Sequence, residues 1–151
     1  MLLVKTLVTA AFAWSLLKGL ELLLRRHSVD RLLLEHIGVG WLWQCILYGM
    51  EVCQVAALLW LWRPYPHGMH FALGAVGLNL ASTLLVTWVG FRHPGALKRA
   101  MVASREERGL PVSEAALTLV EAPLVRAFQI ALPLLIASLW TGLILYIGRG
   151  T

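Results

Sequence analysis

The chain has 151 residues, of which 59% are apolar and only 14% are charged, with a formal net charge of +5. Soluble domains carry about 25% charged residues, and here the charges gather between long apolar stretches, so an ordinary soluble domain is excluded. The basic residues form no stripe interleaved with aromatics, which argues against nucleic acid as a partner and favours loops beside anionic lipid head groups.

Four apolar stretches are long enough to cross a lipid bilayer, which takes roughly 20 residues of helix. They are predicted at 2–24, 40–62, 69–91 and 124–147. The second is bounded by the tryptophan pairs Trp41/Trp43 and Trp60/Trp62, as expected where aromatic rings lie at the two membrane surfaces. Two prolines and a glycine between residues 63 and 68 predict a tight turn, so the second and third spans form an antiparallel hairpin.

The two longer connections are predicted to contain short amphipathic helices. In the first, Ser28 or Asp30 can cap a helix that lies at the membrane surface or tucks under the bundle. In the amphipathic loop 92–122, Pro94 begins one helix, Gly109 follows its end, and a second helix begins near Ser113. The fold class is therefore all-α: a single integral membrane domain, built as a four-helix transmembrane bundle with short interfacial helices in the loops.

The lysines and arginines near the ends of the spans are unevenly distributed, nine on the side of the two long loops against three on the opposite side. Positively charged loops stay in the cytoplasm, so both termini are predicted outside it, in a bacterial inner membrane by default. The loop cations predicted to bind a partner or lipid head groups are Arg92, Lys98, Arg99, Arg105 and Arg108.

Glu51 lies at the centre of the second apolar stretch. An ionised carboxylate there costs roughly 2.5 to 10 kcal/mol, so the side chain must be protonated, paired or turned towards a polar interior. Gln44, Tyr48 and Glu51 share one helical face, with Gln54 close by. Two interpretations are open: a proton-titrating or ligand-binding carboxylate, or a hydrogen-bonded residue that fixes helix packing.

Two further polar features lie within the spans. Lys18 is expected to pair with Glu21, three residues further along the first span, and a pair with Glu51 is the alternative. The third span carries a polar stripe between residues 79 and 87, which either bonds neighbouring helices or lines a cavity facing Glu51. The predicted intramembrane polar site is Glu51, Gln44, Tyr48, Gln54, Lys18, Asn79 and Thr83.

The sequence contains no nucleophile, metal or cofactor motif, so a catalytic role is not expected. The five histidines do not form a ligand set. Cys45 and Cys53 lie eight residues apart on one predicted helix, a rise of about 12 Å, which is too far for a disulfide.

Three features resemble the DoxX-like family of small four-span membrane proteins. The first span has an apolar run that ends in a glycine and a charged residue, here Leu16-Leu17-Lys18-Gly19-Leu20-Glu21. A tight turn leads into the third span. The second carries Tyr48-Gly49-Met50-Glu51-Val52 before Ala56-Ala57-Leu58-Leu59. The likeness covers about residues 11–86, whereas the long basic loop and the predicted outside N-terminus depart from the family's pattern. The resemblance implies a membrane partner in redox or thiol-linked chemistry, often beside a soluble enzyme, and singles out Glu51.

We therefore expect an accessory or anchoring subunit of a larger membrane complex, redox-linked if the resemblance holds, that joins other membrane subunits or copies of itself. Its polar site around Glu51 could hold a quinone or a lipid. The alternative is a homo-oligomeric transporter or channel in which Glu51 is the ion- or proton-binding carboxylate. The small number of polar groups and the long basic loop favour the accessory subunit.

Overall fold

A computed structural model describes residues 2–25, 28–63, 67–119 and 122–149, with the side chains of 115 and 116 left out. These ranges form seven helices and no strand. They are α1 (Leu2–Leu24), α2 (Val29–His36), α3 (Gly40–Trp62), α4 (Gly68–Arg92), α5 (Pro94–Glu107), α6 (Glu114–Leu119) and α7 (Pro123–Gly148). By length and composition, α1, α3, α4 and α7 can cross a membrane. The predicted all-α, four-span fold is confirmed, and each span ends within one residue of its predicted bounds.

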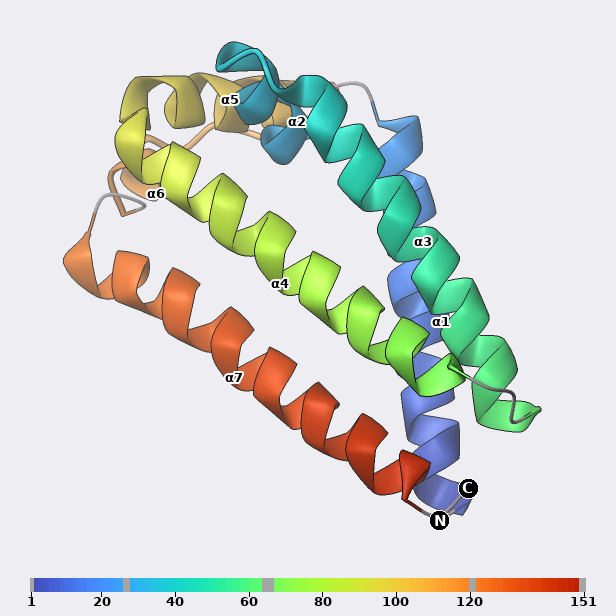
Figure 1. Ribbon diagram of the computed structural model, residues 1–151. Coiled ribbons are helices and arrows are strands. Elements are labelled where there is room, and N and C mark those ends of the chain that lie inside the picture. The colour runs from blue at the N-terminus through green and yellow to red at the C-terminus, as the bar shows by residue number, and fades with distance from the viewer. Residues whose placement is uncertain (1, 26–27, 64–66, 120–121, 150–151) are drawn as a thin grey trace.

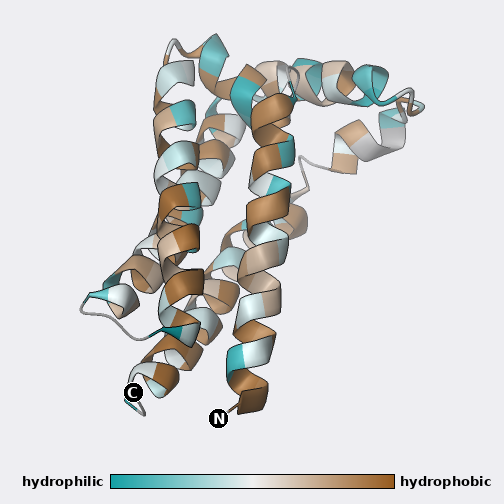
Figure 2. Ribbon diagram, turned by 90° about the vertical axis from the view of Figure 1, so that its right-hand side faces the viewer, coloured by the Kyte–Doolittle hydropathy of each residue, from teal (hydrophilic) through white to brown (hydrophobic). Residues whose placement is uncertain are grey.

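The four long helices lie side by side, with both described chain ends at one end of the bundle, the terminus end (Figure 1). Helices α3 and α4 run antiparallel, as the proline-rich turn predicts, although residues 64–66 of that turn lie outside the described ranges. At the opposite, loop end, α2 and α5 lie across the bundle. The long helices are mostly apolar, and much of the hydrophilic sequence is in these short helices (Figure 2).

The short helices begin and end where local chemistry dictates. The Ser28 side chain accepts a hydrogen bond from the Arg31 amide at 3.3 Å, so Ser28 rather than Asp30 caps α2. Leu33 and Leu34 of α2 are fully buried, which means that this helix tucks into the bundle rather than lying on it. Helix α5 begins at Pro94 as predicted.

Two separate apolar cores hold the bundle together. At the terminus end, all four long helices contribute buried residues, among them Val8, Ala57, Ala72 and Ile144. At the loop end, the buried core comes from α2, α3, α4 and α5, and no residue of α7 takes part. The buried residues of α7 are Ile144 and Ile147, both near its C-terminus. Helix α7 is therefore anchored in the core at one end and rests on the surface of the bundle at the other.

Candidate functional site

Two hydrogen bonds and one packing contact join α1 to α3 along their interface. Trp62 Nε1 donates a hydrogen bond to Thr9 Oγ1 at 3.0 Å, and Gln54 Nε2 donates to Ser15 Oγ at 2.8 Å. One turn further along α1, Gly19 lies against the Glu51 side chain. As the residue number rises along α1, the residue number of the partner on α3 falls, so the two helices run antiparallel and pack along their length.

Glu51 is wedged into this interface. Its side chain is 7% exposed, and neither carboxyl oxygen has a hydrogen-bond partner among the described residues. A Cβ atom placed on Gly19 would lie 1.5 Å from Glu51 Oε1, so the fit depends on glycine at that position. An ionised carboxylate without a partner is costly in this setting, and the geometry therefore favours the neutral acid as a packing element.

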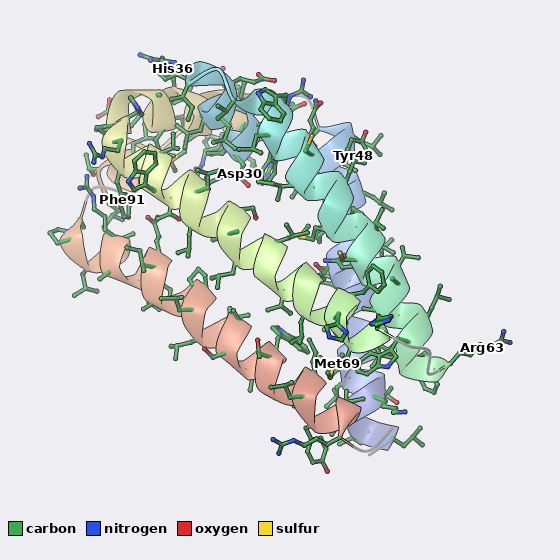
Figure 3. The ribbon with its side chains drawn as sticks, viewed as in Figure 1. Asp30, His36, Tyr48, Arg63, Met69 and Phe91 are labelled. Carbon is green, nitrogen blue, oxygen red and sulfur yellow. The ribbon has the colours of Figure 1, made fainter. Side chains whose placement is uncertain are left out.

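The predicted polar face of α3 is divided in the structure. Gln54 is buried beside Glu51, whereas Gln44 is exposed and Tyr48 is 60% exposed, on the outer side of the helix (Figure 3). The physical reason is that α1 covers only one sector of α3 and ends at Leu24, so that Gln44 extends beyond it. Gln44 and Tyr48 are therefore not part of one interior site with Glu51.

Lys18 pairs with Glu21, as expected, through Nζ and Oε2 at 2.7 Å. Its side chain is 53% exposed, and its ammonium group lies 5.2 Å from the centroid of the Trp14 ring. Arg25 also binds Glu21. In the structure Lys18 thus belongs to a surface ion pair on α1 and does not neutralise Glu51.

A cleft of about 580 Å³ lies at the loop end, lined by residues of α1 to α5 and of α7. It forms because α7 meets α1 near the terminus end, where the Phe12 and Trp140 rings are 6.3 Å apart, and diverges from it towards the loop end (Figure 1). Its walls are apolar, with contributions from Trp43, Leu47 and Phe128. The polar residues that line it are Asp30, Asn79, Ser82, Thr83, Thr87 and Gln129.

The polar stripe of α4 therefore does line a cavity, but not one that faces Glu51. Asn79 and Thr83 contact the cleft, whereas Glu51 is turned away from it towards α1. Sequence reasoning missed Asp30 and Gln129 as lining residues. One feature of the sequence could have indicated Gln129: it lies four residues before Pro133, and both residues line the same wall of the cleft.

Asp30 brings an acidic group to the loop-end mouth of the cleft. It projects from the first turn of α2 beneath the short helices, as Figure 3 shows. Burial raises the pKa of the Asp30 carboxyl above its usual value. This carboxyl therefore keeps its proton to a higher pH than an exposed aspartate does.

A second, smaller cavity of about 60 Å³ lies deeper in the bundle and reaches the α1–α3 interface. Ser15, Gln54 and Asn79 line it together with Trp140. Gln54 Oε1 is buried without a partner among the described residues. A polar cavity of this size has room for water, which would satisfy that oxygen. Asn79 lines both cavities and so connects the cleft to the polar contacts of α1 and α3.

The five loop cations differ in their surroundings. Arg92 lies over the Trp88 ring, with Cζ 5.4 Å from the ring centroid. Arg105 Nη1 donates a hydrogen bond to the carbonyl oxygen of Pro111 at 2.9 Å, so this residue holds the turn after α5. The remaining three lie along α5 and at its end: Lys98 is partly buried, and Arg99 and Arg108 are exposed.

Comparison with protein-family models, with curated proteins and with solved structures finds no match to this chain. The resemblance to the DoxX-like family accordingly stays a prediction.

Proposed function

We propose that this protein is an accessory integral membrane subunit that binds a long apolar molecule with a small polar head, such as an isoprenoid quinone or a lipid. The cleft beside α7 carries the proposal. Its volume of about 580 Å³ lies within the range of small-molecule sites, roughly 300 to 1,000 Å³. Apolar walls with a few polar groups are the usual composition of such sites.

The terminus-end core favours binding over conduction. Val8, Ala57, Ala72 and Ile144 have no exposed surface there, so one chain has a closed apolar layer between the cleft and the terminus end. A hydrated path for an ion would need polar groups through that layer. Glu51, the residue expected to serve a transporter, faces Gly19 rather than either cavity.

The predicted orientation of the protein also places the cleft within the membrane. With the long loops in the cytoplasm of a bacterial cell, the cleft lies in the cytoplasmic leaflet of the inner membrane. Arg99 and Arg108 then face the cytoplasm, where they are available to a soluble or membrane partner. This arrangement suits a subunit that presents a lipid-soluble molecule to a neighbouring protein.

The test is native mass spectrometry of the protein extracted in mild detergent from its own membrane, with an absorption spectrum of the same sample. Thr83→Trp fills the cleft, and Ala81→Trp on the exposed side of α4 is the matched control. We expect a bound molecule in the wild type and the control and none in Thr83→Trp. A wild-type protein with nothing bound, or a Thr83→Trp variant that keeps its ligand, would refute the proposal; a clean, empty homo-oligomer would favour the transporter.

A further inference from the structure

Two of the three hydroxyl side chains that line the cleft, those of Ser82 and Thr83 but not of Thr87, donate their protons to a backbone carbonyl. Ser82 Oγ donates to the Asn79 carbonyl at 2.8 Å, and Thr83 Oγ1 donates to the same carbonyl at 2.9 Å. A hydroxyl group has one proton to donate and two lone pairs to accept with. Towards a ligand in the cleft, both side chains are therefore acceptors of hydrogen bonds rather than donors.

The wall formed by α7 adds a further acceptor. Pro133 lies within α7 and has no backbone N–H. The Gln129 carbonyl, four residues earlier, consequently lacks its regular helical hydrogen bond, and Gln129 and Pro133 both line the cleft. A carbonyl oxygen that lacks this bond keeps a lone pair with which it can accept a hydrogen bond from a nearby donor.

The charged side chains that line the cleft limit which head groups a ligand can carry. Among the described residues that line the cleft, Asp30 is the charged side chain, and none is lysine, arginine or histidine. A phosphate group would find no cation in this cleft and would meet the Asp30 carboxyl at its mouth. The lining thus disfavours a phospholipid head and presents oxygen acceptors instead.

We infer that the cleft selects a neutral head group that donates a hydrogen bond, namely a hydroxyl on an isoprenoid-like chain, as in a polyprenyl alcohol or a quinol. This inference rests on the proposed function, because it names the chemistry of the ligand for the same cleft. The acceptors that would receive the hydroxyl proton are the side chains of Asp30 and Thr83. The side-chain amides of Asn79 and Gln129 also supply donors, which keeps the preference moderate.

The experiment compares two probes that differ in a single donor, farnesol and its methyl ether, titrated into the full-length protein in lipid nanodiscs. One hydrogen bond changes affinity by about 3- to 10-fold, and we expect farnesol to bind more tightly by that factor. In the Asp30→Leu/Thr83→Val double variant, the ratio should fall below about 2-fold. Ala81→Val, on the exposed side of α4, is the control that should leave both affinities unchanged.

The outcomes separate this inference from the proposed function. If both probes bind equally and Thr83→Trp blocks both, the cleft is a binding site and the selectivity for a donor is refuted. If neither probe binds, both proposals fail. A preference that persists in the double variant would also overturn the inference, because the named acceptors would not be its source. A quinol of the same chain length that binds more tightly than farnesol would support an aromatic head, and weaker binding an aliphatic alcohol.

Discussion

The contact between Gly19 and Glu51 makes a quantitative prediction about helix packing. In Gly19→Ala, the new Cβ would lie 1.5 Å from Glu51 Oε1 and 2.7 Å from Glu51 Cδ. Non-bonded atoms need about 3.5 Å, so the carboxyl group must withdraw by roughly 2 Å or α1 must shift. The opposing atoms are the end of a flexible side chain, so either the Glu51 carboxyl moves out of its place in the interface or α1 shifts, and we expect both responses to weaken the packing of α1 on α3.

The expected cost is about 1 to 3 kcal/mol of unfolding free energy, the range for overpacking in a well-packed interior. It can be measured by reversible unfolding in bicelles. The matched control is Gly77→Ala in α4, because a Cβ there has nothing within 4 Å. We expect this control to be neutral or slightly stabilising, since alanine is the better helix former.

A double-mutant cycle tests the cause of the effect. In Glu51→Ala the opposing atoms are gone, so the further change Gly19→Ala should cost less than about 0.5 kcal/mol. If Gly19→Ala costs the same with and without the Glu51 side chain, the contact does not set the distance between α1 and α3. An effect no larger than that of Gly77→Ala would lead to the same conclusion.

Three other predictions concern separate parts of the chain. Because burial raises the pKa of Asp30 from its usual 3.8, the native state loses stability as the pH rises from that value to the raised native pKa, and no further loss follows above it. The difference in melting temperature between wild type and Asp30→Asn should therefore change with pH from 3.8 upwards and then level off, and a difference that is already constant from pH 3.8 upwards would contradict this. Gln54→Leu should cost about 1 kcal/mol and show coupling to Ser15→Ala, because the two side chains share a hydrogen bond; additive effects would exclude that coupling. Arg99→Glu with Arg108→Glu should release a docked partner in co-purification without changing the melting temperature, and unchanged co-purification would exclude docking there.

The helices could be predicted well from the sequence because a membrane-spanning helix needs a stretch of apolar residues that are close together in the chain. A continuous apolar stretch between Trp41 and Trp62 is sufficient to fix α3, and Pro94 is sufficient to place the start of α5. Each of these signals depends on residues that are near in the chain. Tertiary packing was needed only to show that α2 tucks into the bundle, through Leu33 and Leu34.

The candidate site was less predictable, for a geometric reason. Helical periodicity gives the direction of one side chain relative to another, but not which sector of the helix meets its neighbour. Gln44 and Tyr48 therefore look like companions of Glu51 in the sequence, although the end of α1 and the width of its contact leave them exposed. The cleft depends on the angle at which α7 leaves the bundle, and no local pattern near Pro133 encodes that angle.

The one-sided anchoring of α7 has a mechanical consequence. Ile144 and Ile147 hold its C-terminal part in the core, while its first turns rest on α4, where the guanidinium of Arg126 lies 5.2 Å from the centroid of the Phe91 ring. Outward displacement of the N-terminal half of α7 about that anchored end would open the cleft next to α1 and leave both apolar cores intact, because neither core takes a buried residue from that half. A bulky ligand would then enter the cleft laterally from the surrounding bilayer, through the displacement of a single helix.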